Sequence, residues 1–256
     1  MTSFEHFAAL HHNPQPLLLG NLWDVNSAKL LEATGYEAIG VSSQAAAAAF
    51  GYEDGEKMPF ELLLHLAQRV TDVVRIPFTV DLEGGYSRTV TGITDNIKRL
   101  HGLGVVGVNL EDSLVGETRA LRPLPIFQRL LLGIAENLQR SNVRVFLNVR
   151  TDAFLLGLPT ALAETVNRTG AYENAGADGI FVPGIARAAD IAAVVQATRL
   201  PVNVMCMPGL PDFAPLAALG VKRISMGPFW FNQVNDHASR LAQRMLADQN
   251  FSSLLA

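Results

Sequence analysis

Four segments of the sequence share one pattern and decide the fold: LEATGYEAIGVS (31–42), LHGLGVVGVNLE (100–111), ENAGADGIFVP (173–183) and LAALGVKRISMG (216–227). In each segment the end of a helix is followed by a glycine and then by an apolar run typical of a strand. Glycine enters the left-handed backbone conformation that ends a helix at little steric cost, and the positions concerned are Gly35, Gly104, Gly176 and Gly220. Tight connections of this kind from a helix to a strand build parallel sheets.

The remaining apolar runs bring the expected strands to eight. They are expected at 17–20, 38–42, 77–81, 106–111, 144–150, 179–183, 201–204 and 223–226. Helical periodicity fills the intervals, most clearly after Pro59, where apolar residues recur at three- and four-residue steps. This number of strands is typical of the (β/α)8 or TIM barrel, so we expect an α/β protein of that class. A doubly wound open sheet is the alternative, but no GxGxxG follows the first strand.

The length and the composition of the chain are typical of one globular domain. The 256 residues fit a single barrel domain spanning 1–256, because no linker or low-complexity stretch divides them. With 49% hydrophobic and only 17% charged residues, the chain is expected to cover part of its surface in a homo-oligomer. A formal net charge of −4 without a basic stripe argues against a nucleic-acid partner.

Other features restrict the cellular setting and some side-chain roles. No apolar stretch reaches membrane length and the first residues lack a secretion signal, so we expect a cytoplasmic protein without a membrane partner. The one cysteine, Cys206, excludes an internal disulfide and a cysteine-rich metal site, and we expect it to be buried. The histidines near the N-terminus, His6, His11 and His12, are expected in a solvated tail.

Acidic residues stand where several of the expected strands end. In chain order the charged residues at or just beyond the strand ends are Asp54, Glu56, Asp81, Glu83, Glu111, Asp112, Arg150 and Asp152. The carboxyl ends of the strands form the mouth of a parallel barrel, so these carboxylates would meet there and repel one another. A bound cation relieves the repulsion. Because no histidine falls at a strand end, the ligands would be oxygen atoms, which favours Mg2+ or Mn2+ over Zn2+.

The cationic residues restrict the chemistry further. The chain has four lysines, and none stands at the carboxyl end of an expected strand. Three of them, Lys29, Lys98 and Lys222, lie on expected helices or at the amino end of a strand, and Lys57 lies in a loop. We therefore expect no Schiff-base lysine. Arg150 is then the main fixed cation for a substrate carboxylate or a developing oxyanion, because a guanidinium binds a carboxylate through two hydrogen bonds. Mg2+ and Arg150 together describe a site that stabilises an enolate.

The chain resembles the isocitrate lyase/phosphoenolpyruvate mutase superfamily over most of its length. The resemblance lies in WDVNSAKLLEATGYEAIGVSS, AFGYEDGE, VDLEGGYS, GVNLEDS, NVRTDAF and AGADGIFVPG. It implies that Ser42, with the backbone amides of Ser43 and Gln44, binds the substrate, although Ser42 and Ser43 could also be helix caps. It implies that Mg2+ is held, partly through water, by Asp54, Asp81, Glu83 and Glu111. The catalytic residues implied are Ser42, Asp54 and Arg150, in a homotetramer whose last helix is swapped between subunits.

Two segments depart from the pattern of that superfamily. The loop EDSLVGETRALRPLP (111–125) contains Arg119 and Arg122 but lacks the cysteine of the superfamily's lyases, and Pro183 stands where the mutases carry a histidine-bearing segment. Neither isocitrate-type cleavage nor phosphonopyruvate rearrangement therefore follows from the resemblance. We expect residues 112–125 to form a mobile lid hinged at Gly116, with a solvated surface position for both arginines favoured over an inward one.

The sequence thus predicts a Mg2+-dependent lyase-type enzyme. It would act on a small 2-oxo or 2-hydroxy carboxylic acid through an enolate, by carbon–carbon cleavage or decarboxylation. Because the loop lacks a positioned proton donor, decarboxylation or hydrolysis is favoured over cleavage of isocitrate or methylisocitrate. Two alternatives stay open, namely a phosphonopyruvate mutase or hydrolase and a barrel that binds an oxo acid without turnover.

Overall fold

The computed structural model, which describes residues 2–114 and 119–255, contains a closed barrel of eight parallel strands. Around the barrel their order is β1-β10-β9-β8-β7-β4-β3-β2. The strands are β1 (Leu17–Leu22), β2 (Ile39–Val41), β3 (Phe78–Asp81), β4 (Gly107–Glu111), β7 (Phe146–Arg150), β8 (Gly179–Val182), β9 (Val202–Met205) and β10 (Arg223–Ser225). The predicted TIM barrel is confirmed, and each predicted strand lies within two residues of its observed bounds.

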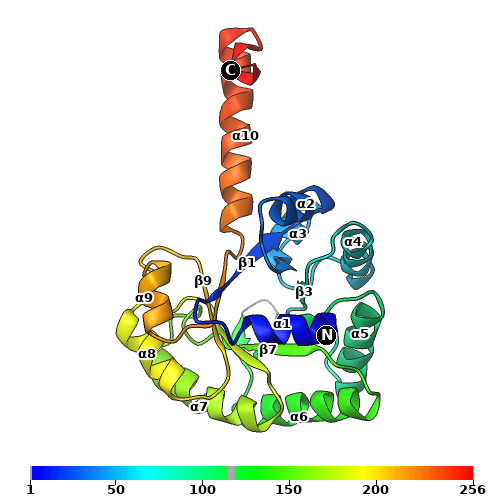
Figure 1. Cartoon of the computed structure of the whole chain (residues 1–256), viewed down its shortest axis with the longest axis vertical. Coiled ribbons are helices and arrows are strands. Elements are labelled where there is room, and N and C mark those ends of the chain that lie inside the picture. Colours follow the sequence, from blue (N-terminus) through cyan, green and yellow to red (C-terminus); the bar gives the residue numbers. More distant parts are fainter. Residues whose placement is uncertain (1, 115–118, 256) are drawn as a thin grey trace.

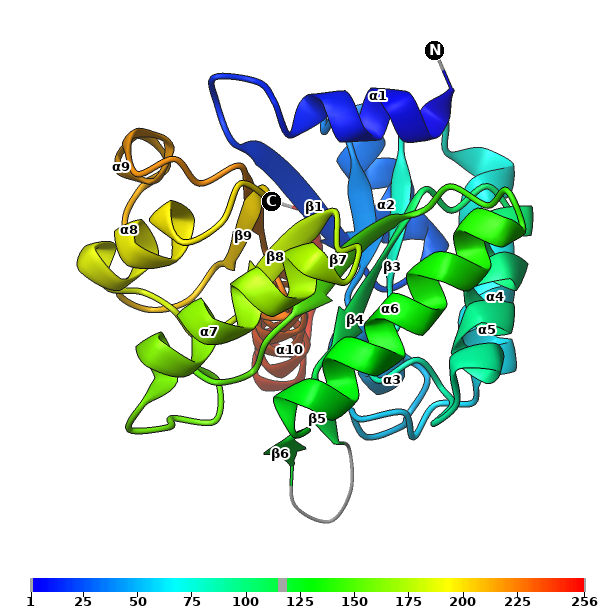
Figure 2. The ribbon, with the colours of Figure 1, turned by 90° about the horizontal axis from the view of Figure 1, so that it is seen from below.

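Helices surround the barrel and cover its outer face (Figures 1 and 2). They are α2 (Val25–Ala33), α3 (Ser43–Ala49), α4 (Phe60–Val73), α5 (Val90–Gly102), α6 (Leu124–Arg140), α7 (Ala161–Asn174), α8 (Ala188–Gln196) and α9 (Phe213–Ala218). The helix expected after Pro59 is α4, which buries Leu63, Leu66, Ala67 and Val70. The main apolar core lies in this layer between helices and strands, so the barrel interior is left free for polar side chains.

A separate helix, α1 (Ser3–Leu10), closes the amino end of the barrel and lies in Figure 2 at the end opposite the hairpin of β5 (Ser113–Leu114) and β6 (Ala120–Leu121). Phe7 and Leu10 pack there with the first residues of several strands in a second apolar cluster. His11 is 2% exposed, and its ring stacks on Phe146 with centroids 4.5 Å apart. The expectation of a solvated tail is therefore wrong for His11, because the apolar floor of the barrel needs a cover. Cys206, expected to be buried, is exposed.

The long connection after β4 contains a short antiparallel hairpin, made of β5 (Ser113–Leu114) and β6 (Ala120–Leu121). Its strands hold both ends of the connection close to the carboxyl mouth of the barrel, since β5 follows β4 after one residue. Gly116, the hinge of the predicted lid, lies outside the described residues, and the predicted motion stays a prediction.

The last long helix, α10 (Phe229–Asp248), projects away from the barrel (Figure 1), and none of its residues is buried. At its start, Trp230 and Phe231 pack on Trp23, with ring centroids 4.7 and 5.1 Å away. The predicted exchange of this helix between subunits stays a prediction. In the part of the chain that the structure describes, no helix combines the length and the apolar character needed to cross a membrane.

The four glycines that end the repeated helices have the predicted left-handed conformation. Their φ angles are 92° at Gly35, 97° at Gly104, 92° at Gly176 and 88° at Gly220. The surroundings of two of them differ. A Cβ at Gly104 would have its nearest neighbour, Thr71, at 3.9 Å, whereas a Cβ at Gly176 would lie 2.7 Å from the Cβ of Ala135 in α6. Conformational strain and steric overlap can therefore be separated with one matched pair of substitutions.

We expect Gly104→Ala to lower the free energy of unfolding by about 1 kcal/mol, the usual cost of a left-handed alanine. Gly176→Ala should cost at least about 1 kcal/mol more, because the new methyl group must displace α6. Urea unfolding of the two variants and the wild type measures both values. Equal losses in the two variants would contradict the role assigned to the contact with Ala135.

Candidate active site

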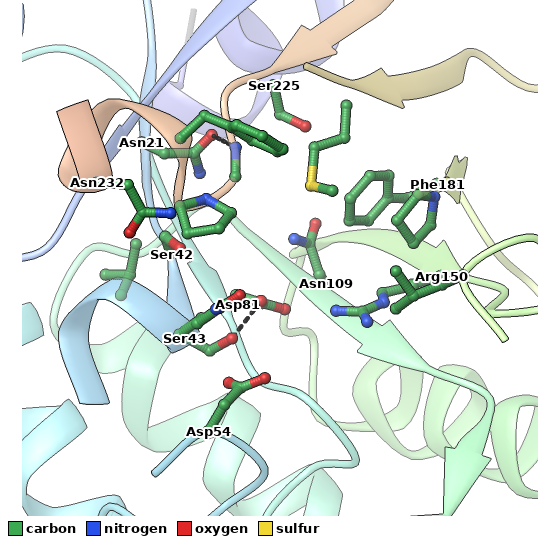
Figure 3. Close-up of a pocket in the computed structure, with 18 of the residues that line it drawn as sticks. Asn21, Ser42, Ser43, Asp54, Asp81, Asn109, Arg150, Phe181, Ser225 and Asn232 are labelled. Carbon is green, nitrogen blue, oxygen red and sulfur yellow. Dashed lines mark hydrogen bonds between the residues drawn. The ribbon is translucent and has the colours of Figure 1, made fainter. Parts of the chain in front are cut away.

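A cavity of about 350 Å³ lies at the carboxyl ends of the strands and contains most of the predicted site residues. Those that line it are Ser42, Ser43, Gln44, Asp54, Asp81 and Arg150. In Figure 3, Ser43, Asp54 and Asp81 gather on one side, and Arg150 lies across from them with Asn109 between. The cavity therefore has acids on one wall and a guanidinium on another.

The barrel strands position these side chains directly. Asp81 ends β3 and Arg150 ends β7, so both stand at the mouth. Ser42 follows β2 and caps α3, because its Oγ accepts a hydrogen bond of 3.4 Å from the amide of Ala45. The Oγ of Ser43 donates to Oδ2 of Asp81 at 2.7 Å. Ser42 is thus a helix cap that also lines the cavity, whereas Ser43 orients the acid beside it.

Asp81 carries a buried oxygen without a hydrogen-bond partner. The residue is 9% exposed, and its Oδ1 receives no hydrogen bond from any residue in the ranges 2–114 and 119–255. A buried carboxylate oxygen left in this state costs free energy, since it has lost water and gained no donor. The geometry therefore leaves one oxygen of Asp81 for a ligand.

Glu83 is buried behind this wall and does not line the cavity. It is 3% exposed and has a left-handed φ of 51°. Its Oε2 accepts a hydrogen bond of 2.9 Å from the amide of Glu56, and its Oε1 accepts one of 3.3 Å from the hydroxyl of Tyr86. Burial, followed by the charges of Asp54, Asp81 and Glu111, raises the pKa of Glu83 to about 8. The acids of the mouth cannot all be ionised at neutral pH without added positive charge.

Two arginines and two acids form a buried four-charge cluster on the other side, consisting of Glu111, Arg119, Arg150 and Asp152. Nη2 of Arg119 lies 2.5 and 2.6 Å from the two oxygens of Glu111, and Nε of Arg150 lies 2.6 Å from Oδ1 of Asp152. Two longer pairs close the cluster, Arg150 to Glu111 at 3.2 Å and Arg119 to Asp152 at 3.1 Å. Glu111 is only 1% exposed, and the negative charge of its carboxylate is balanced by the guanidinium groups of Arg119 and Arg150.

The favoured surface interpretation of Arg119 and Arg122 is wrong. The side chain of Arg119, directly before β6, is only 25% exposed, lines the cavity and forms ion pairs with the buried acids Glu111 and Asp152. Arg122 is 6% exposed, and its amide donates to the carbonyl of Asp112 at 2.8 Å. The hairpin after β4 thus supplies an arginine to the site, whereas its sequence alone indicated exposed charges.

Several polar residues inside the barrel were missed by sequence reasoning. Asn148 donates to the side-chain oxygens of Asn109 and Asn203 at 2.9 and 3.1 Å. Oδ1 of Asn21 accepts from the amides of Met226 and Gly227 at 2.7 and 3.1 Å. The missed residues that line the cavity include Asn21, Asn109, Arg223 and Ser225. Their signal is a polar residue within an apolar strand, as in LLLGNL, GVNLE, FLNVR and VNVM.

The donor set of the cavity fits a hard divalent cation. Among the residues described, no three acid, histidine or cysteine side chains form a complete cage for a metal ion. Mg2+ does not require one, since it keeps several water ligands and binds one or two carboxylates directly. The unpaired oxygen of Asp81, with Asp54 on the same cavity wall, supplies donors of this kind. Burial and then the charge of Asp81 raise the pKa of Asp54, which a nearby cation would oppose.

The match to known proteins covers nearly the whole barrel. The model of the phosphoenolpyruvate phosphomutase family matches residues 7–246. The chain belongs to this family. A provisionally named phosphonomutase of Burkholderia cenocepacia J2315, a crystal structure, is 37% identical and superposes with a TM-score of 0.89 over 94% of this chain and 99% of that one. The family assignment confirms the resemblance drawn from the sequence.

Three further proteins are similar to this chain in sequence or in fold. An uncharacterized protein of Mycobacterium tuberculosis is 32% identical over 221 residues, which cover 86% of this chain and 81% of that protein. The oxaloacetate decarboxylase of Paraburkholderia xenovorans LB400 is 29% identical over 82% of this chain and 71% of its own length. A phosphonopyruvate hydrolase, solved with oxalate and Mg2+, shares the fold with a TM-score of 0.85 at 21% identity, covering 98% and 89% of the two chains.

Glu83 gives the metal-free protein a defined dependence of stability on pH. Its pKa is about 8 in the folded protein against an ordinary value of 4.5, so the folded chain keeps a proton that the unfolded chain releases. The stability contributed by this group is fully present below the pKa of the unfolded chain, 4.5, and is lost as the pH rises through the pKa of the folded chain, about 8. We therefore expect this group to lower the unfolding temperature of chelator-treated protein between about pH 5 and pH 8, against an opposite contribution of His11 below pH 6.5.

Thermal unfolding of Glu83→Gln across the same range checks this assignment. The variant should lose most of the slope, whereas a control change at an exposed acid, Glu136→Gln, should keep it. An unchanged slope in Glu83→Gln would show that another group carries the dependence.

Proposed function

We propose that the protein is a Mg2+-dependent cytoplasmic lyase, a single-domain barrel acting on a small 2-oxo or 2-hydroxy carboxylic acid, with decarboxylation of a 2-oxo acid as its best-supported reaction. One observation carries the proposal: the cavity holds a buried, unpaired oxygen of Asp81 across from the guanidinium of Arg150. A 2-oxo acid needs two kinds of partner, a cation at its oxygens and hydrogen-bond donors for the charge that develops. The cavity offers an oxygen of Asp81 that would hold such a cation, and Arg150 offers hydrogen-bond donors.

The roles proposed for Asp81 and Asp54 follow from where the side chains lie: Asp81 would hold the metal directly and Asp54 would act through water. Glu83 and Glu111 do not line the cavity, and their proposed action on the metal through water rests on the resemblance to the superfamily. When bound, Mg2+ would supply positive charge for the substrate oxygens. Ser42, Ser43 and Gln44, which line the cavity, would bind the substrate carboxylate. Arg150 would donate from the edge of its guanidinium left free by Asp152 and Glu111 and would stabilise the enolate as the bond breaks.

Decarboxylation suits this cavity because carbon dioxide leaves without a proton. Among the described residues that line the cavity there is no histidine, cysteine, lysine or tyrosine, and Asp54 and Asp81 are its carboxyl groups. Cleavage that expels a carbanion needs a positioned acid for the departing fragment. In decarboxylation the electron pair stays on the retained fragment, and the proton that this fragment finally takes can come from water after carbon dioxide has left. The similarity to oxaloacetate decarboxylases supports this choice.

Hydrolysis or rearrangement of phosphonopyruvate is the second candidate. The 37% identity to the provisionally named phosphonomutase favours it. Release of inorganic phosphate from phosphonopyruvate would identify hydrolysis, and formation of phosphoenolpyruvate would identify rearrangement. Metal-dependent binding without turnover of any acid would instead identify a barrel that only binds oxo acids.

The test compares carbon dioxide release from a panel of 2-oxo acids with Mg2+ and with excess EDTA. We expect release with Mg2+ above the rate measured without protein, and only the uncatalysed rate with EDTA. Asp81→Asn should lower kcat/KM about 100-fold or more, since a neutral amide binds the cation poorly. Asp72→Asn, at an exposed acid paired with Arg69, should leave kcat/KM unchanged. Full activity in EDTA, or in Asp81→Asn, would sink the proposed metal site.

We also propose that the chain assembles as a homotetramer through α10. The support is that no residue of this helix is buried, while Val234 and Leu246 on it are 41% and 74% exposed. Changing both residues to Glu should lower the mass measured by analytical ultracentrifugation, because charge would enter an apolar contact. Gln243→Glu adds charge on the same helix without removing an apolar group and should leave the mass unchanged. A monomeric wild type would refute the assembly.

A further inference from the structure

Three residues in a left-handed backbone conformation lie together behind the acidic wall of the cavity. They are Glu56, Glu83 and Tyr86, with φ angles of 59°, 51° and 53°. Residues other than glycine adopt this conformation at a cost in free energy, so it persists only where the surroundings impose it. Two loops meet at these residues, namely residues 50–59 between α3 and α4 and residues 82–89 between β3 and α5. Contacts between the two loops therefore hold both in one defined arrangement.

Glu56 makes the contacts that join the two loops. Its Oε1 accepts a hydrogen bond of 2.7 Å from the amide of Tyr86, and its Oε2 lies 2.7 Å from Nη2 of Arg88. Its own amide donates to Oε2 of Glu83 at 2.9 Å. The side chain of Glu56 is 9% exposed and is not among the described residues that line the cavity. We term these three contacts the Glu56 clasp, which engages both carboxylate oxygens with the neighbouring loop.

The Glu56 clasp anchors the loop that carries Asp54. Residues 48–54 are exposed, and the buried side chains that tie this loop down are those of Glu56 and Met58. In the part of the chain that the structure describes, no ion pair is formed by Asp54 and no side chain donates a hydrogen bond to it. Asp54 nevertheless lies on the cavity wall with Asp81 (Figure 3). Its place there depends on the backbone of its loop, and thus on the clasp two residues further along the chain.

Hydrogen bonds to backbone amides form the main part of the clasp. The amide of Glu56 donates to one loop partner and its carboxylate accepts from the amide of Tyr86, so the two loops hold each other in both directions. The loops approach so closely that a Cβ at Gly84 would lie 3.1 Å from Oε1 of Glu56. The ion pair with Arg88 contributes less, because the side chain of Arg88 is 49% exposed and water screens the charge. An uncharged acceptor in place of the carboxylate should therefore preserve most of the clasp.

We propose that Glu56 is a positioning residue for the metal site, which fixes Asp54 beside Asp81 by clasping the two loops and does not itself touch the metal. This inference rests on the proposed function, in which both aspartates take part in holding Mg2+. Groups that orient metal ligands from behind affect metal affinity about 10- to 100-fold. Because binding linkage is reciprocal, a cation bound at the site stabilises the clasp in turn. The metal affinity and the order of the two loops are thus coupled.

Calorimetric titration of the full chain with Mn2+ alone measures the affinity for a cation that prefers the same oxygen ligands. We expect Glu56→Ala to raise the Kd at least about tenfold. Glu56→Gln should stay within about threefold of the wild type, because its amide oxygen still accepts from Tyr86 and the lost ion pair is half-exposed. Glu53→Ala, which removes an exposed acid of the same loop, should also stay within about threefold. Equal losses in Glu56→Gln and Glu56→Ala would assign the effect to charge and overturn the inference.

A double-mutant cycle with Asp54→Asn separates positioning from a general structural role. In the Asp54→Asn background, Glu56→Ala should change the Kd less than about twofold, because the group that Glu56 positions is already lost. A structural role would give the same loss in both backgrounds.

Glu56→Gly separates metal affinity from stability, because glycine relaxes the left-handed φ of 59° while the carboxylate is still lost. This variant should unfold at a higher temperature than Glu56→Ala and yet bind Mn2+ no more tightly. Recovery of the Mn2+ affinity together with the stability would overturn the inference.

Hydrogen exchange of the wild type tests the coupling without any variant. The amides of Glu56 and Tyr86 donate within the clasp, so their exchange should slow at least about threefold with saturating Mg2+. The amide of Glu136, on α6, should not respond. Unchanged exchange at both clasp amides, in protein that binds Mg2+, overturns the inference and leaves the proposed function intact. Failure of the proposed function is a different result, namely no cation binding by the wild type or a Kd that Asp81→Asn does not raise, and it overturns both.

Discussion

The structure depends on how negative charge is balanced where parallel strands converge. Closing eight strands into one barrel brings their carboxyl ends to a single mouth, and this chain places buried acids on β3 and β4. Like charges at such spacing oppose folding unless cations, shared protons or hydrogen bonds offset them. The chain uses two separate means. Arginines balance the β4 side, whereas hydroxyl and amide donors leave the β3 side with spare acceptor capacity.

A second buried network fixes the arginine-rich side from behind. Asp112, directly after β4, is 0% exposed and accepts from the hydroxyl of Tyr172 at 2.6 Å and from Arg168 at 3.0 Å. Its other oxygen accepts from the amide of Asp152 at 3.1 Å, and Arg168 also donates to the carbonyl of Arg122 at 2.9 Å. Helix α7 thereby ties the end of β4, the end of β7 and the hairpin together. This hydrogen-bond network holds in place the backbone segments that carry the ion pairs at the mouth.

The sequence allowed the fold to be predicted because its signals are local. A glycine such as Gly104 ends a helix, and the alternation in GVNLE marks a strand, without reference to distant residues. Asp81 and Arg150 could be predicted for the same reason. Each is the last residue of its strand, and the carboxyl ends of all strands of a parallel barrel lie at the same mouth. Arg119 and Arg223 were not, because their positions depend on tertiary contacts. Arg119 lies in the hairpin and faces the buried acids. Arg223 occupies a position of β10 whose side chain faces the barrel interior. In the sequence, however, an arginine next to Lys222 has the appearance of a surface charge.

The closure of the amino end by α1 makes the barrel respond to acid from the side away from its carboxylates. Burial lowers the pKa of His11 from 6.5 to about 3, so the folded chain keeps this imidazole neutral in mild acid. The unfolded chain gains a proton there as the pH falls below 6.5, and folding is weakened by that difference. Acid therefore weakens the apolar floor at His11, whose ring stacks on Phe146, at the end of the barrel opposite the candidate active site.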